Sequence, residues 1–264
     1  MIEDVFLGPA APDLGWVPAP RYVLRRARIL RHLDALAPGK LLEVGPGAGM
    51  LLVEAARRGF RCEALELSAE ARTLSATVIA RSGQHIPVHA DAGAGWEKSF
   101  DALFAFDVLE HIEHDREALM QWHDWLAPDG TLLLSVPAHA RMWTAGDEWA
   151  GHFRRYEREP LLQLLRETGF EPECVECYGF PLTNLSERLS ARIYARRIHH
   201  HGAAQDNRQR NNDRSGTDRG PHLKLYPLLS SAPGKLALRA FCGIQQWFVN
   251  TDLGSGYLVK ARRA

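Results

Sequence analysis

Apolar residues follow two alternating patterns between residues 20 and 180 of the chain. Short continuous apolar runs are typical of strands that are buried on both faces, and they alternate with longer segments whose apolar residues recur at helical spacing. This alternation predicts an α/β fold with a mostly parallel sheet and helices on both of its faces. The predicted strands are 40–44, 62–67, 88–90, 101–106, 131–136 and 172–178, and the predicted helices are 22–37, 50–58, 70–81, 115–126 and 161–168.

The pattern changes beyond Pro181. Residues 182–196 place leucine and isoleucine at helical spacing and arginine on another face, which predicts a basic amphipathic helix. Residues 202–220 contain no large apolar side chain, so we expect a mobile loop there. Residues 256–261 predict a last strand that returns to the edge of the sheet. The expected division is a main domain of residues 1–180 plus 251–264 and a helical insertion of residues 181–250 before the last strand.

The stretch LLEVGPGAGM, residues 41–50, places Gly45, Gly47 and Gly49 directly after the first predicted strand. A glycine loop between a strand and a helix presents backbone N–H groups to a ligand, and the missing side chains let that ligand come close. Dinucleotide sites need the spacing G-x-G-x-x-G, but here Met50 holds the place of the third glycine. A P-loop is excluded because no Lys-Ser or Lys-Thr follows. An NAD-dependent oxidoreductase of Rossmann type is therefore disfavoured but stays an alternative.

The motif Glu43-x-Gly45-x-Gly47-x-Gly49 resembles the first motif of class I S-adenosylmethionine-dependent methyltransferases, and the resemblance covers about residues 22–180. It implies a Rossmann-like, seven-stranded, mostly parallel sheet and S-adenosyl-L-methionine as the cofactor. It also implies that the glycine loop wraps the methionine portion of that cofactor. The cofactor-binding residues that it implies are Glu43, Gly45, Gly47, Gly49, Glu66, Leu67, Asp91, Ala92 and Asp107.

The resemblance gives a role to each acid at a strand end. Glu43 orients the cofactor, and Glu66 accepts hydrogen bonds from both ribose hydroxyls. Asp91, beside the backbone of Ala92, accepts from the adenine amino group. Asp107, within the string FDVLEH, lines the methionine end. Physical reasoning supports the ribose role independently, because an acid ~20 residues past such a loop is placed to accept two ribose hydrogen bonds.

The connection of residues 137–156 follows the fifth predicted strand, at the sheet edge where open α/β folds bind ligands. It is dense in polar and aromatic residues and is similar to a signature of a bacterial subgroup of these methyltransferases, many of which act in lipid, polysaccharide or natural-product pathways. His139 and His152 are the candidate general bases, since histidine titrates near neutral pH, and packing within the loop is their alternative. The candidate acceptor-binding residues are Trp143, Arg154, Arg155 and Tyr156. For the two arginines the alternative is pairing with Asp147 or Glu148.

Overall composition excludes several classes of protein. The chain has 32 Lys plus Arg and 32 Asp plus Glu, so we expect no nucleic-acid partner. Four scattered cysteines do not suit a secreted fold, and Cys174-x-x-Cys177 lacks a second pair, so we expect a cytoplasmic protein without a bound metal. The sequence shows neither a signal peptide nor ~18 uninterrupted apolar residues, so we expect no membrane span.

Local charge differs from this balance. Residues 188–224 carry nine Lys or Arg against three Asp, an excess of six positive charges. Together with the amphipathic pattern, this excess indicates peripheral contact of residues 182–224 with an anionic inner membrane surface, where a lipid-linked acceptor would be met. A solvated arginine face over a buried leucine stripe is the alternative.

These observations predict a methyltransferase that moves the methyl group of S-adenosylmethionine to a small-molecule, lipid-linked or saccharide-linked acceptor. A non-catalytic S-adenosylmethionine-binding regulatory protein is a further alternative, since both would carry the same cofactor site. Formation of S-adenosylhomocysteine separates the two.

Overall fold

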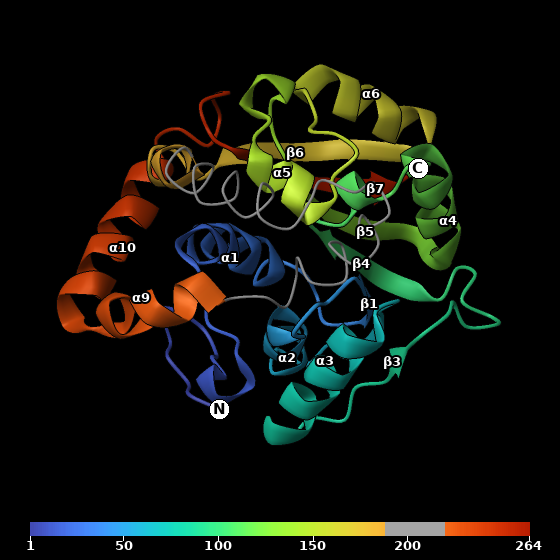
Figure 1. The fold of residues 1–264 in the computed structure, drawn as a ribbon. Coiled ribbons are helices and arrows are strands. Elements are labelled where there is room, and N and C mark those ends of the chain that lie inside the picture. Colours follow the sequence, from blue (N-terminus) through green and yellow to red (C-terminus); the bar gives the residue numbers. More distant parts are fainter. Residues whose placement is uncertain (188–219) are drawn as a thin grey trace.

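The computed structural model describes residues 1–187 and 220–264 of the chain (Figure 1). The predicted loop at residues 202–219 and the greater part of the predicted amphipathic helix lie outside the described residues. The boundaries 181–250 of the insertion as a separate unit stay a prediction.

A seven-stranded sheet forms the centre of the molecule, with the strand order β3-β2-β1-β4-β5-β7-β6 (Figure 1). Of these strands, β7 alone runs antiparallel to its neighbours. The predicted seven-stranded, mostly parallel sheet is therefore confirmed. The strands are β1 (Lys40–Val44), β2 (Arg61–Leu65), β3 (Val88–His89), β4 (Phe100–Phe106), β5 (Leu126–Pro137), β6 (Phe170–Tyr178) and β7 (Gly256–Arg263).

Helices cover both faces of the sheet, and each face has its own buried apolar cluster. One cluster contains Trp122 of α4 and Leu161 of α6, and the other contains Ile29 of α1, Leu52 of α2 and Val78 of α3. Figure 1 shows the same division, with α1, α2 and α3 on one side and α4 and α6 on the other. The helices are α1 (Pro20–Leu33), α2 (Met50–Ala56), α3 (Ala69–Arg81), α4 (Asp115–Trp125), α5 (Ala145–Ala150), α6 (Arg158–Glu167), α9 (Gly220–Ser230) and α10 (Ala232–Gln245), and the short 3₁₀ turns are η1 (Pro12–Leu14), η2 (Leu109–His111) and η3 (Ala140–Met142).

The last strand corrects one prediction from the sequence. We expected residues 256–261 at the sheet edge, but β7 lies between β5 and β6, and β6 forms the edge. Tyr257, Leu258 and Val259 are fully buried, as an interior strand with both faces covered requires. Three consecutive apolar residues already carried that signal, because an exposed edge strand alternates apolar and polar side chains.

Helix α1 also differs from its predicted range of 22–37. It begins at Pro20, because proline at the first helical position lacks only an N–H group that would be unpaired there. It ends at Leu33, and the chain continues in a tighter turn. In this turn the backbone N–H groups of Ala35 and Leu36 donate to the carbonyls three positions earlier, those of His32 and Leu33. The earlier start places Arg21 within the helix.

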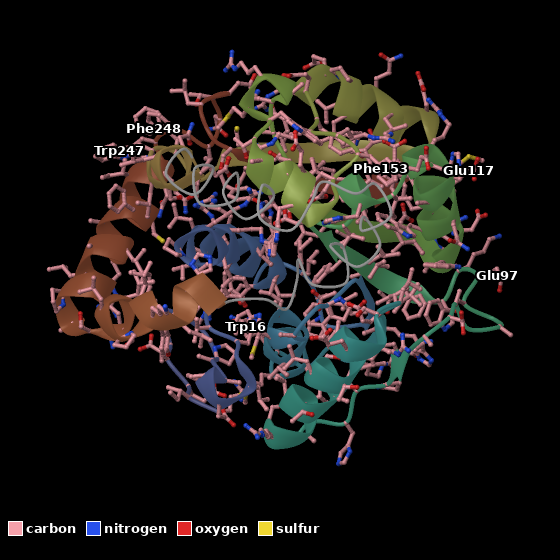
Figure 2. All side chains as sticks on the ribbon, in the orientation of Figure 1. Trp16, Glu97, Glu117, Phe153, Trp247 and Phe248 are labelled. Carbon is pink, nitrogen blue, oxygen red and sulfur yellow. The ribbon has the colours of Figure 1, made fainter. Side chains whose placement is uncertain are left out.

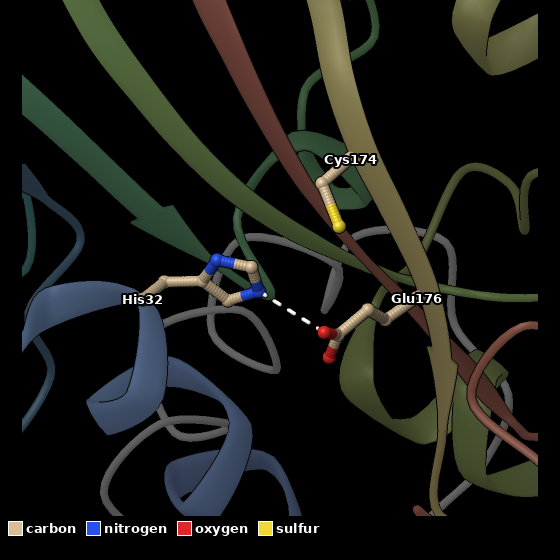
Figure 3. Close-up of side chains that lie close together, drawn as sticks. All are labelled: His32, Cys174 and Glu176. Atoms are coloured by element: carbon tan, nitrogen blue, oxygen red, sulfur yellow. Dashed lines mark hydrogen bonds and ion pairs between the residues drawn. The ribbon is translucent and has the colours of Figure 1, made fainter. Parts of the chain in front are cut away.

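An ion-pair cluster joins helix α1 to the edge strand β6, and Figure 3 shows its contact between His32 and Glu176. Arg28 donates from Nε and Nη2 to the two carboxylate oxygens of Glu176, both at 2.6 Å, and the His32 Nε2 lies 3.2 Å from Oε1. Although burial raises the pKa of Glu176, hydrogen bonds from Arg28 and His32 lower it to about 2. The sulfur of Cys174 lies within 4.8 Å of a ring nitrogen of His32 and a carboxylate oxygen of Glu176, a grouping that could hold a metal ion. The positive charges of Arg28 and nearby residues oppose binding of a metal ion here.

The C-terminal helices α9 and α10 pack against α1 on the side away from the sheet (Figure 1). Tyr226 of α9 and Leu238 of α10 share a buried cluster with Val23 and Leu24 of α1. Across the described ranges 1–187 and 220–264, the helices are too short or too polar to cross a membrane.

Candidate functional site

The glycine loop connects β1 to α2 at the carboxyl edge of the sheet. Gly45, Gly47 and Gly49 have φ angles of 64°, 55° and 73°, a region that glycine enters without the penalty paid by other residues. A Cβ atom on Gly45 would lie 2.6 Å from a methyl group of Val108, so that position requires glycine for space as well as for conformation. The loop therefore keeps its backbone bare where a ligand would contact it.

Two acids border this loop. Glu43, at the end of β1, is buried, and its Oε2 has no hydrogen-bond partner in the described structure. Burial raises the pKa of Glu43 to about 8. Glu66 follows β2, and its carboxylate accepts hydrogen bonds from the backbone N–H groups of Gly47 (3.2 Å) and Ser68 (3.0 Å). The structure thus brings both predicted acids to the loop.

The remaining residues predicted around the adenosine portion follow β2 and β3 at the same edge. Leu67 comes directly after Glu66 and is 72% exposed, which suits an apolar side chain that a flat ring would cover. Asp91 and Ala92 come two and three residues after the end of β3 and are exposed. All of these positions are accessible to a ligand bound beyond the strand ends.

Asp107 follows β4 and is surrounded by positive charge. It has a left-handed φ of 55° and forms an ion pair with Arg25, while Arg21 Nη2 lies 3.8 Å from its Oδ1. Ser135 donates a hydrogen bond to Asp107 Oδ1 at 3.1 Å. Burial raises the pKa of Asp107, but the charges of Arg25 and Arg21 outweigh this effect and lower it to about 2.

The sequence interpretation did not single out Arg25, and its predicted helix of 22–37 left out Arg21. Both residues belong to one stripe of α1, since Arg21, Arg25, Arg28 and His32 follow one another at intervals of four, three and four. This spacing of three arginines and a histidine along one side of the helix was the available signal.

The buried polar atoms without a partner in the described residues include three near the glycine loop and Asp107: Nε of Arg21, Nε of Arg25 and Oε2 of Glu43. Buried polar groups are normally paired, so each of these atoms indicates a missing ligand or water. A ligand with a carboxylate would accept from the two arginines, and its ammonium group would favour the charged form of Glu43. An amino-acid portion like that of S-adenosylmethionine fits this set of donors and acceptors.

His152 and Asp147 form a buried pair on the connection after β5. His152 Nδ1 lies 2.9 Å from Asp147 Oδ1, and Arg155 donates to both oxygens of Asp147 at 2.7 and 2.9 Å. Burial raises the pKa of Asp147, but hydrogen bonds from His152 and Arg155 outweigh it and hold this pKa far below its usual value. The pair lies near the site, because His152 Nε2 is 4.0 Å from Oε1 of Glu110, three residues after Asp107 in the chain.

Two residues of η2 complete this side of the site. Glu110 is buried and has an unpartnered Oε2, and burial followed by the charge of Asp107 raises its pKa well above the usual value. His111 packs edge-on against His152 with a ring distance of 4.6 Å, and burial together with His152 lowers its pKa to about 3. Ligand atoms of Glu110, His111 and His152 lie within 4.8 Å of one another, so these side chains are also a candidate divalent-cation site. The string FDVLEH contained Glu110, which the sequence interpretation did not single out.

Of the other predicted acceptor residues, Arg155 adopts the alternative of pairing with Asp147, whereas Arg154 and Tyr156 contact an acid that the sequence analysis did not name. Arg155 is 3% exposed at its side chain and pairs with Asp147 and Glu187, so no ligand reaches it. Arg154 pairs with Asp115 at 2.8 Å, and the Tyr156 hydroxyl donates to the same carboxylate. These contacts correct the assignment of all three residues to acceptor binding, because each polar group is already used within the protein.

His139 and Trp143 also differ from expectation. His139 is buried, and its ring nitrogens lie near Glu157 (3.4 Å), Tyr257 (3.5 Å) and the Cys177 sulfur (4.0 Å). The structure does not bring it to Asp107, which leaves His152 as the candidate base. Trp143 is 38% exposed, and its indole N–H donates to Glu148 at 3.4 Å. Phe153, labelled in Figure 2, ties this connection to η2 through a 2.8 Å backbone hydrogen bond from its N–H to the Glu110 carbonyl.

The sequence profile of a family described as a methyltransferase domain matches residues 20–175, which include the loop, the strand-end acids and the His152 pair. The chain belongs to this methyltransferase family. The resemblance first seen in the glycine motif is therefore confirmed, and the oxidoreductase alternative is disfavoured.

Curated relatives of this methyltransferase are similar over part of their length. It is 29% identical to the ubiquinone biosynthesis O-methyltransferase of Erwinia tasmaniensis over 43% of this chain and 48% of that protein. It is 26% identical to the protein of the same name from Xanthomonas euvesicatoria over 60% of this chain and 73% of that protein. The chain spans about half the length of several such relatives.

Solved structures share the fold of this methyltransferase. A phosphoethanolamine N-methyltransferase of Haemonchus contortus in complex with S-adenosyl-L-methionine matches with a TM-score of 0.55 and 17% identity, over 90% of this chain and 52% of that one. An S-adenosylmethionine-dependent methyltransferase of Mesorhizobium loti has a TM-score of 0.54 and 17% identity, over 93% of this chain and 98% of that one. The cyclase SpnF has a TM-score of 0.58 and 19% identity, over 99% of this chain and 87% of that one. The fold by itself therefore does not specify methyl transfer.

Proposed function

We propose that this methyltransferase moves the methyl group of S-adenosyl-L-methionine to an oxygen atom of a small-molecule acceptor. The His152–Asp147 pair carries the proposal, because it places a candidate base 4.0 Å from Glu110, three residues after Asp107, at the edge that bears the glycine loop. The names of the partial relatives, which are O-methyltransferases, support the choice of oxygen.

The residues around the glycine loop would hold the cofactor. Arg21 and Arg25 would donate to its carboxylate, Glu43 would face its ammonium group, and Glu66 would accept from its ribose hydroxyls. Asp91, beside the Ala92 backbone, would take the adenine amino group. When bound, the cofactor supplies an electrophilic methyl group on a sulfonium. Alignment of donor and acceptor then provides much of the rate, about 7 to 11 kcal/mol in well-oriented systems.

His152 would remove the proton of the acceptor hydroxyl. The 2.9 Å contact of its Nδ1 with Asp147 favours the tautomer that has hydrogen on Nδ1 and a lone pair on Nε2. Nε2 lies 4.0 Å from Oε1 of Glu110. The Asp147 carboxylate would stabilise the imidazolium after proton transfer, as in other Asp–His pairs.

The test combines binding with product formation. Isothermal titration of the protein with S-adenosylmethionine and with NAD should give binding for the first alone. Incubation of the protein with metabolite extract and cofactor labelled in the methyl group should give S-adenosylhomocysteine and a labelled product. Binding without any product from such extracts would favour the non-catalytic regulatory alternative.

A second experiment tests the base. His152→Asn should lower kcat by about 100-fold or more while the dissociation constant of the cofactor changes little, because a positioned base contributes ~10²–10⁴-fold. His85→Asn is a matched control, since His85 is an exposed histidine before β3. An unchanged kcat in His152→Asn would remove the proposed base.

We further propose that the acceptor is presented at an anionic inner membrane surface. Of the sequence first assigned to membrane contact, residues 182–187 and 220–224 are described, and α9 and α10 extend that surface. Residues 220–251 contain no Asp or Glu but include Lys224 and Arg239. The exposed large apolar side chains of this surface are Leu225, Leu228, Leu236 and Trp247, with exposed fractions of 50%, 65%, 68% and 79%.

Trp247 follows α10 at the outside of the molecule, next to Phe248 (Figure 2). Exposed tryptophan beside cations suits the interface between water and an anionic bilayer. Co-sedimentation with phosphatidylglycerol vesicles at low salt tests this proposal, and Trp247→Gln should reduce the bound fraction. Met120→Gln on α4 is the control, since Met120 is 53% exposed outside this surface. Absence of binding to these vesicles at low salt would refute membrane contact without affecting the proposed reaction.

A further inference from the structure

Glu187 joins the predicted insertion to both halves of the site. Its Oε1 accepts from Arg21 Nη1 at 2.7 Å, and its Oε2 accepts from Arg155 Nη1 and Nη2, each at 3.3 Å. The side chain is 16% exposed. The residue lies beyond the range 20–175 that the family profile matches.

Each of the two arginines also has a second acid at the site. Arg21 Nη2 lies 3.8 Å from Asp107, which is farther than its contact with Glu187. Arg155 holds Asp147, the partner of His152. Glu187 is therefore the shared acid between a cation on the cofactor side and a cation on the acceptor side.

The charges around Asp107 make this bridge consequential. Arg25 already forms a close ion pair with Asp107. If Glu187 lost its charge, Asp107 would be the nearest remaining acid for Arg21 in the described structure, and Arg21 would close the 3.8 Å gap. The site would then hold one more uncompensated positive charge, and Asp107 would be paired twice.

We propose that Glu187 is a positioning residue that holds Arg21 away from Asp107 and so preserves the negative potential that a sulfonium requires. This inference rests on the proposed cofactor. It predicts that Glu187 contributes more to binding of S-adenosylmethionine than to binding of S-adenosylhomocysteine, which lacks the positive charge on sulfur. A unit charge at ~10 Å in a medium of effective dielectric constant ~20 changes affinity on the order of ten-fold.

The experiment measures dissociation constants of both compounds by isothermal titration. Glu187→Gln should bind S-adenosylmethionine about ten-fold more weakly and S-adenosylhomocysteine no more than about two-fold more weakly. Glu187→Asp keeps the charge, so the ratio of its dissociation constants for S-adenosylmethionine and S-adenosylhomocysteine should stay near that of the unaltered protein. Glu3→Gln removes the charge of another carboxylate that binds an arginine, Arg57, and should leave the ratio unchanged.

A double variant tests whether Glu187 acts through Arg21. In Arg21→Gln/Glu187→Gln the displaced cation is absent, so the ratio of the two affinities should return toward that of the unaltered protein. Equal weakening of both compounds in Glu187→Gln, or an unchanged ratio, would overturn the proposal. If the unaltered protein bound neither compound, the proposed function itself would fail, which is a different result.

Discussion

Asp147→Asn removes one negative charge from a largely buried cluster of charged side chains. The carboxylate of Asp147 accepts from Arg155 and His152, and also from the Thr144 backbone N–H at 2.8 Å. The Arg155 side chain is 3% exposed, so solvent does not replace the lost partner. Breaking a buried ion pair from one side costs about 3–5 kcal/mol, and we expect about 3 kcal/mol because Arg155 retains Glu187 at 3.3 Å.

The unfolding free energy that Asp147→Asn removes should depend on pH and become smaller in acid. The pKa of Asp147 in the folded protein lies below its value of about 4 in the unfolded chain, because the hydrogen bonds from His152 and Arg155 outweigh the effect of burial. The stability that this shift provides is complete above about pH 4 and is lost as pH falls toward the folded pKa. The difference in unfolding free energy between the two proteins should therefore be constant near neutral pH and narrow below about pH 4.

Urea denaturation at pH 7 and at about pH 3.5 measures this difference. Asp13→Asn is the control, since Asp13 pairs with Arg81 at the surface, where solvent screens the two charges. Equal urea midpoints for Asp147→Asn and the unaltered protein at pH 7 would refute the reasoning. If the difference in unfolding free energy between the two proteins is the same at about pH 3.5 as at pH 7, the charge of Asp147 does not have the proposed role.

Three other substitutions test the site and the fold. Glu66→Ala should weaken cofactor binding by roughly 1–3 kcal/mol through lost charged hydrogen bonds, measured by isothermal titration. Gly45→Ala should abolish that binding, because its Cβ would lie 2.6 Å from Val108, whereas Gly15→Ala meets nothing within 4 Å and should bind normally. Arg28→Met should lower the free energy of unfolding by about 3 kcal/mol or more in urea titrations, since it leaves a buried carboxylate without its main partner.

Local sequence patterns predicted the strand-end half of the site. Gly45 and Glu66 lie where the alternation of strands and helices places them, because a strand end, a turn and a helix start are all encoded by neighbouring residues. The same reasoning extends to Asp107, whose position after β4 follows from the apolar run before it. These predictions required no knowledge of which distant residues meet.

Side-chain partners across the fold could not be predicted in this way. Arg25 pairs with Asp107, 82 positions later in the chain, and Glu187 meets Arg21 across 166 positions. Spacing within one element does not reveal such pairs. Arg155 is an example, since its residue type suited acceptor binding, but its donors are already used by Asp147 and by Glu187.

The interior position of β7 has a consequence for the order in which the molecule assembles. Among the strands that the structure describes, β6 bonds only to β7, although β7 follows it by more than seventy residues. During synthesis β6 must therefore wait, without a hydrogen-bonding neighbour, until the later segment has emerged from the ribosome. Chains paused within that interval would expose both the β5 and β6 edges, and such unpaired edges invite aggregation.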